Sequence, residues 1–424
     1  MKKVNVAIMG FGTVGTGVYK VLEKEKKNIE EKEGISLNIA KVYSRHFHYN
    51  IPDILKVYSV DDISEDPDID IVIETIGGIE PTKDLVLQCL NSGKTVVTAN
   101  KKMIAMYWPE LEEAAKKTGA GLYFEASVGA GIPILRTIDD SLQANTISSV
   151  EAIINGTTNY ILTKMYLEGR DYDDVLREAQ ELGYAEADPS ADVDGYDAMY
   201  KLAILASKAF HTRIPIDRIY MEGISGIKKK DIQFASDFGY VIKLLAIARK
   251  NGKKIELRVH PAMISKQHPL ANVLDSYNAI LLNGNAIGDI MVYGRGAGDF
   301  PTASAVLSDV VYAAQKTKHK YASFKNNMGE LSEELEFNTN WQNPFYIRLD
   351  LLERPGVLSK VTKIMGDHNI SLNLVMQKGI KKEAATIVFL TYPSNEKDVQ
   401  AAIQELKLSE VVKKVSAVIR IIED

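Results

Sequence analysis

The sequence predicts an α/β protein in which a doubly wound parallel sheet is followed by a mixed α+β domain and a small ferredoxin-like module. Three observations predict this fold. Short β-branched runs alternate with helical patterns over the first third of the chain. A glycine-rich turn follows the first of these runs. Beyond residue 344 the pattern restarts in the order βαββαβ, which is typical of a ferredoxin-like unit.

The first third contains the strands of the predicted parallel sheet. They are expected at residues 4–9, 37–43, 69–74, 95–98 and 122–125. Helices are expected after the first strand and over residues 82–92. Pro109 is expected in the first turn of another helix, where its missing N–H costs little, and Gly119 follows the end of that helix.

The rest of the chain predicts a central region and a separate final module. Central helical patterns occur at 159–168, 173–183, 197–210, 238–250 and 302–314, and strand-like runs at 149–154, 255–264 and 280–282. The final module has strand patterns at 345–351, 370–376, 385–391 and 411–422, with helical patterns at 357–365 and 399–406. We expect domains at 1–132 (completed by about 301–320), 133–300 and 344–424, with a linker at 321–343.

Composition excludes several classes of protein. The 424 residues include 51 Lys+Arg and 56 Asp+Glu, so the net charge is −5, which argues against a nucleic-acid binder with a concentrated basic face. No apolar run approaches the roughly 20 residues that span a bilayer. Cys89 is the only cysteine, which excludes an internal disulfide. With no secretory signal pattern at the N-terminus, a cytoplasmic location is expected.

A glycine motif after the first strand indicates a dinucleotide site of the Rossmann type. The motif reads Gly10-Phe11-Gly12-Thr13-Val14-Gly15. Gly10 permits the tight turn, Gly12 lets a pyrophosphate approach the backbone, and Gly15 allows close packing of helix on strand. Free N–H groups at the helix start would hold the phosphate. The alternative is a tight turn in an α/β fold that binds no nucleotide.

The end of the second strand predicts the cofactor. An NAD site usually has an acid there, which binds the ribose 2′-hydroxyl, whereas this chain has Arg45 and no carboxylate. A guanidinium suits a 2′-phosphate, so we expect a preference for NADP(H); the alternative is that Arg45 is a solvated loop residue. Thr75, Thr98 and Lys101 follow later strands of the same sheet and are candidates to contact the ribose, the nicotinamide or the reacting groups.

An acidic segment leads into a helix that contains Lys201. Asp197 and Lys201 are four residues apart, so they share one helical face, which borders an apolar stripe. Shielding from water would lower the pKa of the lysine, whereas the carboxylate would favour its charged form, and the sequence does not decide between them. The alternative is a solvated acid cluster with a surface ion pair. The pattern fits neither a calcium loop nor a zinc site.

Taken together, these segments resemble homoserine dehydrogenase, and the resemblance covers essentially the whole chain. The specific segments are Asn100-Lys101, residues 125–133, residues 155–162, residues 183–201 and residues 296–303. The final module resembles an ACT domain, with Arg354-Pro355-Gly356-Val357-Leu358 at its strand-to-helix turn. The resemblance implies a nucleotide-binding, a substrate-binding and dimerisation, and a regulatory domain, in this order.

The resemblance also implies the reaction and the role of each site residue. L-Aspartate 4-semialdehyde and NAD(P)H would give L-homoserine, on the route to threonine, methionine and isoleucine. Lys201 would be the general acid and Asp197 would orient it. The other substrate-site residues would be Glu186, which binds the substrate ammonium, Asp192, Lys101, and the pocket-lining Asn155, Gly156 and Thr157.

Three further expectations follow from the resemblance. A monovalent cation, typically sodium, would bind carbonyl oxygens at Glu125, Val128, Ala130 and Ile132. Threonine would be the effector of the ACT module, the alternative being a purely structural module. The chain would form a dimer or tetramer and bind neither nucleic acid nor membrane. Two other readings compete: another NADP-dependent amino-acid semialdehyde oxidoreductase, or a non-catalytic sensor of nucleotides and amino acids.

Overall fold

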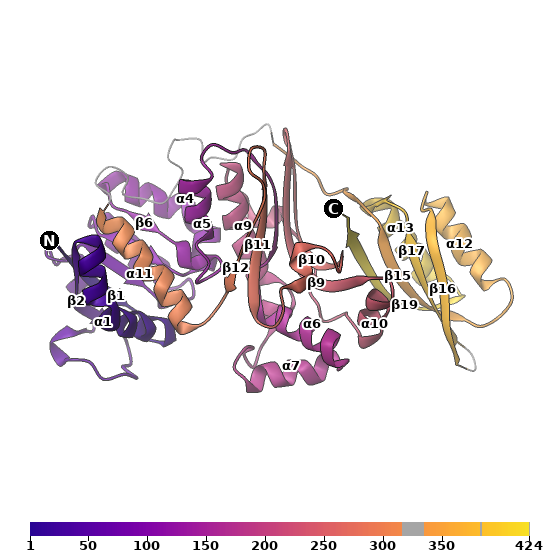
Figure 1. Cartoon of the computed structure of the whole chain (residues 1–424), viewed down its shortest axis with the longest axis horizontal. Coiled ribbons are helices and arrows are strands. Elements are labelled where there is room, and N and C mark those ends of the chain that lie inside the picture. Colours follow the sequence, from indigo (N-terminus) through magenta and orange to yellow (C-terminus); the bar gives the residue numbers. More distant parts are fainter. Residues whose placement is uncertain (316–334, 382–383, 424) are drawn as a thin grey trace. The chain divides into compact units, whose positions relative to one another are not determined.

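The computed structural model describes residues 1–315, 335–381 and 384–423 (Figure 1). The chain forms two compact units. Unit 1 consists of Met1–Gly156, Asp197–Ile219 and Ser276–Glu334, and unit 2 of Thr157–Tyr196, Tyr220–Asp275 and Leu335–Asp424. Of the predicted linker and the predicted end of the first domain, residues 316–334 lie outside the described residues.

Unit 1 contains the predicted parallel sheet. Its strands are β1 (Lys2–Met9), β2 (Ile35–Tyr43), β3 (Lys56–Val57), β4 (Ile71–Glu74), β5 (Thr95–Thr98) and β6 (Leu122–Tyr123). They lie in the order β3-β2-β1-β4-β5-β6, and every pair is parallel. This order reverses direction between β1 and β4, which is the place where Rossmann-type sheets bind a dinucleotide. The predicted fold class is confirmed for this unit.

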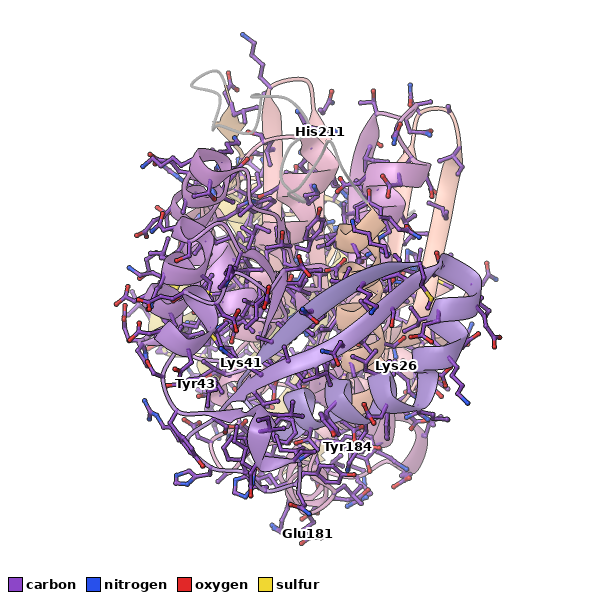
Figure 2. The ribbon with its side chains drawn as sticks, turned by 90° about the vertical axis from the view of Figure 1, so that its left-hand side faces the viewer. Lys26, Lys41, Tyr43, Glu181, Tyr184 and His211 are labelled. Atoms are coloured by element: carbon purple, nitrogen blue, oxygen red, sulfur yellow. The ribbon has the colours of Figure 1, made fainter. Side chains whose placement is uncertain are left out.

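Helices cover the sheet because their apolar faces are buried against it. They are α1 (Thr13–Glu33), α2 (Asp61–Ser64), α3 (Thr82–Asn91), α4 (Lys101–Thr118) and α11 (Asp299–Gln315). Val18 and Leu22 of α1 and Val306 of α11 belong to one buried core with Val6 and Ile8 of β1. Figure 2 looks onto this layer from the side of β2, where Lys41 and Tyr43 are labelled, with Lys26 on α1.

The position predicted for Pro109 is wrong. Helix α4 begins at Lys101, and the side chain of Asn100 accepts a hydrogen bond from the N–H of Met103 as an N-cap. Pro109 lies inside the helix, where it removes one backbone hydrogen bond. Buried Trp108 and Leu111 beside it supply the packing that offsets this loss. Gly119 does end the helix, with a φ of 71°.

Unit 1 also holds an antiparallel ribbon and short helices. The ribbon consists of β7 (Ile147–Ile153), β11 (Tyr277–Gly284) and β12 (Gly288–Arg295), in the order β12-β11-β7. Helix α5 (Ile134–Arg136) belongs to the unit, as does helix α9 (Tyr196–Phe210) from its second residue, Asp197, onward. The strand predicted at 122–125 ends at Tyr123 and passes into a 3₁₀ turn at Glu125–Ser127.

Unit 2 combines helices with a second sheet, and part of it is the final module described below. Outside that module, the helices are α6 (Gly156–Glu168), whose first residue belongs to unit 1, α7 (Tyr172–Glu181), α8 (Ser190–Val193) and α10 (Lys229–Asp237). The long strands β9 (Tyr240–Asn251) and β10 (Lys254–Ser265) form a hairpin. The short strands β8 (Tyr220–Met221) and β13 (Glu336–Phe337) pair with β10, and β14 (Gln342–Asn343) pairs with β18 (Ser394–Asn395).

The helix predicted at 238–250 is wrong, because this segment forms β9. Residues 241–248 are all buried, so neither a helical nor a strand period is visible in their apolar character. A continuous apolar run does not distinguish a buried strand from a buried helix. The turn at Gly252, with a φ of 60°, and the following β10 were the signals for a hairpin.

The final module has the predicted βαββαβ order. Its elements are β15 (Phe345–Leu352), α12 (Val357–Asp367), β16 (Leu372–Lys381), β17 (Ala384–Thr391), α13 (Glu396–Leu408) and β19 (Val412–Ile422). Its strands lie in the order β19-β15-β17-β16, and β19 continues the sheet by pairing in parallel with β10. Phe345, Phe389, Val361 and Ile403 meet in its core. None of the described helices has the length and apolar character that crossing a membrane needs.

Candidate active site

The glycine turn after β1 is shaped by backbone that approaches it closely. Gly10 has a φ of 100°, and a Cβ there would lie 2.6 Å from the backbone N of Ile76. A Cβ on Gly15 would lie 2.0 Å from the carbonyl oxygen of Gly10, so helix α1 can begin only with glycine here. Thr75 donates a hydrogen bond to the same carbonyl at 2.7 Å. Gly12 has open space around it, which leaves its backbone accessible to a phosphate.

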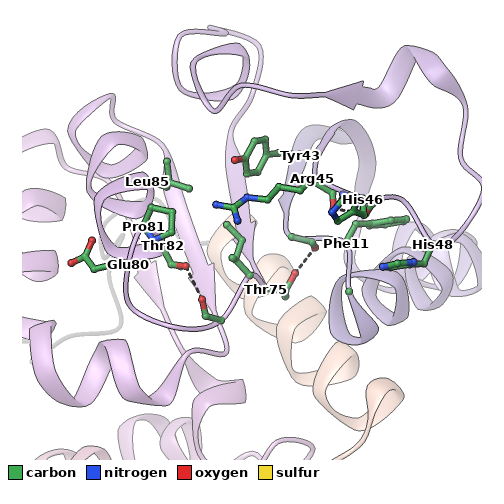
Figure 3. A pocket seen from close by; sticks show the side chains of 15 residues that line it. Phe11, Tyr43, Arg45, His46, His48, Thr75, Glu80, Pro81, Thr82 and Leu85 are labelled. Carbon is green, nitrogen blue, oxygen red and sulfur yellow. Dashed lines mark hydrogen bonds between the residues drawn. The ribbon is translucent and has the colours of Figure 1, made fainter.

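A cavity of about 350 Å³ adjoins this turn. The glycine turn, the segment after β2 and the segment after β4 line it; the residues are Gly10, Phe11, Gly12, Tyr43, Ser44, Arg45, His46, His48, Thr75, Ile76, Gly77, Glu80, Pro81, Thr82 and Leu85. Figure 3 shows the Arg45 guanidinium reaching into the cavity toward Thr82. The cavity therefore extends from the glycine turn to the end of β2, where an adenosine ribose lies in Rossmann-type sites.

Glu74, at the end of β4, orders the loops on the ligand side of the sheet. Its carboxylate accepts hydrogen bonds from the backbone N–H groups of Ile76 and Gly77, at 2.7 and 3.1 Å, and from Thr98 Oγ1 at 2.5 Å. Burial raises the pKa of this carboxyl group, and the three donors oppose that shift. Glu74 was not among the site residues predicted from the sequence, although a carboxylate that ends a buried strand was a usable signal.

Asp197, which is buried, joins two lysines, of which Lys101 is 42% exposed. Its Oδ2 lies 2.7 Å from Lys201 Nζ, one turn further along α9, and its Oδ1 lies 2.7 Å from Lys101 Nζ, in the first turn of α4. Asn155 donates to Oδ2 at 2.9 Å, and Lys201 also donates to the carbonyl oxygen of Ile154 at 2.8 Å. The side chain of Lys201 is 10% exposed, so the pair is not the solvated surface pair considered as an alternative.

The two lysines keep the Asp197 carboxyl group ionised. Burial alone would raise the pKa of Asp197, but the nearby ammonium groups of Lys201 and Lys101 hold it well below its usual range. The carboxylate is therefore ionised at neutral pH. It holds two ammonium groups in place, and an ammonium group can donate a hydrogen bond to an electron-rich ligand.

The remaining predicted substrate-site residues have different surroundings. A Cβ on Gly156 would lie 2.9 Å from the carbonyl oxygen of Ser276, which keeps the turn after Asn155 close to that strand. Thr157, Glu186 and Asp192 belong to unit 2. There Thr157 Oγ1 donates to the carbonyl of Tyr184 at 2.6 Å, Glu186 is exposed, and Asp192 is half-buried on α8. The cluster around Asp197 is formed within unit 1.

The four residues predicted to bind a cation lie in one tightly folded segment. Val128 N–H donates to the carbonyl of Glu125, Ile132 N–H donates to that of Gly129 at 2.9 Å, and Ala130 has a φ of 45°. The buried Glu125 carboxyl accepts from the backbone N–H groups of Leu135 and Arg136. Burial, followed by nearby Asp309, raises its pKa to about 8. The described residues contain no group of three or more His, Cys, Asp or Glu side chains that could hold a metal ion.

Three features together define the class of this protein: a Rossmann-type sheet with an open glycine turn, two lysines that contact one carboxylate, and a C-terminal ferredoxin-like module. They are the features of a dinucleotide-dependent oxidoreductase with an added regulatory-type module. Comparison with known families agrees. Residues 10–125 match the model of the homoserine dehydrogenase NAD-binding domain, residues 133–311 match homoserine dehydrogenase, and residues 345–407 match the ACT domain.

Individual relatives cover the whole chain. Homoserine dehydrogenase of Bacillus subtilis is 39% identical, over 99% of both chains. A solved homoserine dehydrogenase from Thiobacillus denitrificans is 39% identical, with a TM-score of 0.92 over 100% of this chain and 99% of that one. A hyperthermophilic archaeal homoserine dehydrogenase, solved in complex with NADPH, is 30% identical, with a TM-score of 0.64 over 75% of this chain and 99% of that one. The chain belongs to the homoserine dehydrogenase family.

Proposed function

We propose that the chain reduces L-aspartate 4-semialdehyde to L-homoserine with NADPH and that Lys201 is the general acid. The observation that carries this proposal is the contact of Lys101 and Lys201 with the two oxygens of one buried carboxylate. Reduction of an aldehyde builds negative charge on its oxygen, and a positioned ammonium group stabilises that charge. NADPH, when bound, supplies the hydride.

The proton step belongs to the residues of the cluster. Lys201 Nζ delivers a proton to the carbonyl oxygen as the C–H bond forms, and the amine takes a proton back from solvent after the alcohol leaves. Asp197 remains ionised throughout and fixes the direction of the Lys201 side chain. Lys101 adds a second positive charge on the same side. Glu186, supported by Asp192, would bind the substrate ammonium.

The cofactor preference is proposed from the wall of the cavity. Arg45 lines it and no carboxylate follows β2 before residue 53, so a 2′-phosphate finds a cation and no repulsion there. The archaeal relative in complex with NADPH agrees with this proposal. Thr75 follows β4 and lines the cavity, so it stays a candidate contact of the cofactor. Thr98, at the end of β5, is fully buried and donates its hydroxyl hydrogen to Glu74, so its part is to hold the loop in place.

A cation site and an effector site complete the proposal. Sodium takes oxygen ligands, and the carbonyl groups of Glu125, Val128, Ala130 and Ile132 fit that need because their tight turn fixes where they lie. Threonine would act on the ACT module. The resemblance to the family also implies that the chain forms a dimer or a tetramer. A threonine titration of the rate, with and without potassium, tests the effector; an unchanged rate at millimolar threonine favours a purely structural module.

One assay tests the proposed reaction. Purified protein is mixed with aspartate semialdehyde and NADPH, and the loss of absorbance of the reduced nicotinamide is followed; the reverse reaction uses homoserine and NADP. We expect turnover in both directions. Turnover with other amino-acid semialdehydes but not this one would assign a different oxidoreductase, and no turnover with any of them would favour a non-catalytic sensor.

A further inference from the structure

Two histidines line the nucleotide cavity and have no part in the function proposed above. His46 and His48 follow β2, both are exposed, and their ring centroids lie 6.4 Å apart. Figure 3 shows both rings on the side of the cavity where Phe11 lies, whereas the Arg45 guanidinium reaches toward the opposite side. The cavity wall therefore presents three nitrogen-bearing side chains within four consecutive residues.

The loop that carries these histidines is anchored by its middle residue. Phe47 packs against Phe11 of the glycine turn, with ring centroids 5.9 Å apart, and against Tyr58 at 6.0 Å. Ser44 Oγ donates to the carbonyl oxygen of His46 at 2.6 Å. Phe47 is half-buried, whereas His46 and His48 on either side of it are exposed and line the cavity.

The charged groups around this loop include as many carboxylates as cations, but the carboxylates do not lie on the cavity wall beyond β2. Those on the elements that pack against it are Arg45, Lys20 and Glu23 on α1, Lys56 on β3 with its partner Asp53, and Glu80 across the cavity. Lys20 lies over the ring of Tyr49 and Lys56 over that of Phe47. Among the described residues that line the cavity, Glu80 is the one carboxylate. The side chains on the wall beyond β2 are thus cationic or neutral.

We propose that His46 and His48, together with Arg45, bind the phosphate monoester on the 2′ position of the adenosine ribose, and that their protonation makes the preference for the phosphorylated dinucleotide depend on pH. This inference rests on the proposed use of NADPH. A phosphate monoester keeps about half of its second charge at about pH 6 and more of it above that pH, so it remains a strong acceptor as the pH falls from 8 toward 6. Each imidazole that becomes protonated over this range adds a charge-assisted hydrogen bond to it.

NADH is the built-in control, because it carries a hydroxyl where NADPH carries the phosphate. Any effect of pH on Lys201, on the substrate or on folding changes both cofactors alike and cancels in their ratio. The ratio of kcat/KM for NADPH to kcat/KM for NADH should therefore rise as pH falls from 8 to 6. One charge-assisted contact corresponds to about a tenfold change in affinity at most, so we expect a rise of roughly three- to tenfold.

The experiment compares four proteins at constant ionic strength. They are the unaltered chain, the double variant H46Q/H48Q, the variant Arg45→Ala and the control His368→Gln, whose imidazole lies 2.8 Å from Glu405 in the ACT module. The pH-dependent rise should vanish in H46Q/H48Q and persist in His368→Gln. In Arg45→Ala the ratio should be lower at every pH but keep its slope. Binding of each reduced cofactor, followed by nicotinamide fluorescence, gives the same comparison without turnover.

The outcomes separate this inference from the proposed function. A pH-independent ratio in the unaltered chain, or a slope that survives in H46Q/H48Q, overturns the inference while NADPH turnover stands. Equal weakening of NADPH and NADH in H46Q/H48Q would assign the rings to stacking on adenine and also overturns it. If semialdehyde reduction is absent but fluorescence shows NADPH binding that tightens at low pH through these histidines, the proposed function fails and the inference is supported.

Discussion

Two buried aspartates of this chain bind their cations in different ways. In unit 1, each oxygen of Asp197 contacts a different lysine, and the side chain of one of them, Lys101, is 42% exposed. In unit 2, Asp231 accepts both Nε and Nη2 of Arg348, at 2.7 and 2.9 Å, together with the hydroxyl of Tyr346 and the N–H of Lys228. There one cation meets one anion in a bidentate contact.

The difference separates a reactive cluster from a structural one. A balanced, fully bonded pair offers nothing to a ligand, and its role is to join α10 to β15. Around Asp197 the cations are two ammonium groups, one of them 42% exposed, so an approaching carbonyl oxygen can reach a donor. Burial alone therefore does not identify a catalytic site; the access of a ligand to the cation does.

Replacing Lys201 should have the largest effect on this comparison. We expect Lys201→Met to lower kcat by about 10²–10⁴-fold, because the general acid is lost, while NADPH affinity stays nearly unchanged. Steady-state kinetics and a fluorescence titration of NADPH measure the two quantities. Lys208→Met is the matched control: Lys208 is buried on the same helix and pairs with Asp139 at 2.7 Å, so its loss should lower stability but not kcat. Near-normal turnover in Lys201→Met would remove it from the mechanism.

Breaking the balanced pair should act on stability instead. Arg348→Met leaves the buried Asp231 carboxylate without its cation, which should lower the free energy of unfolding by about 3–5 kcal/mol. Urea denaturation measures this. The double variant Asp231→Leu, Arg348→Met should regain much of the loss, since no buried charge remains. A stability unchanged in the single variant would show that the contact is not a structural joint.

The smallest expected effect concerns pH and Asp197. Because the folded chain lowers the pKa of this carboxyl group, its ionisation stabilises the fold at pH values above the unfolded pKa of about 3.9, and this stabilisation is lost as the pH falls further. The melting temperature of the unaltered chain should thus decline more steeply below pH 4 than that of Asp197→Asn. Parallel declines in the two proteins would contradict the assigned shift.

Local spacing predicted part of the site. The four-residue interval between Asp197 and Lys201 was enough to place both on one helical face, and the glycine turn was readable from its position after a strand. The contact between Lys101 and Asp197 was not, because it joins two helices that are distant in sequence. Glu74 was missed because its buried hydrogen bonds, which order the loops, are tertiary.

The errors in the predicted elements have the same origin. Residues 240–251 form a strand because a hairpin partner buries them, although their apolar run alone fits a helix equally well. Pro109 is tolerated inside α4 because helix residues before and after it, such as Trp108 and Leu111, are buried. In both places tertiary packing overrides the local signal. The fold class was predictable since it depends on the alternation of many segments, which no single error changes.

The two helix starts at the cluster have opposite electrostatic consequences. Asp197 lies in the first turn of α9, where the partial positive charge of the helix end favours an anion, whereas Lys101 lies in the first turn of α4, where the same partial charge opposes a cation. The Asp197 carboxylate offsets this unfavourable position of Lys101. Neutralising that single carboxylate would weaken the hold on both ammonium groups, although Lys201 would keep its hydrogen bond to the carbonyl oxygen of Ile154.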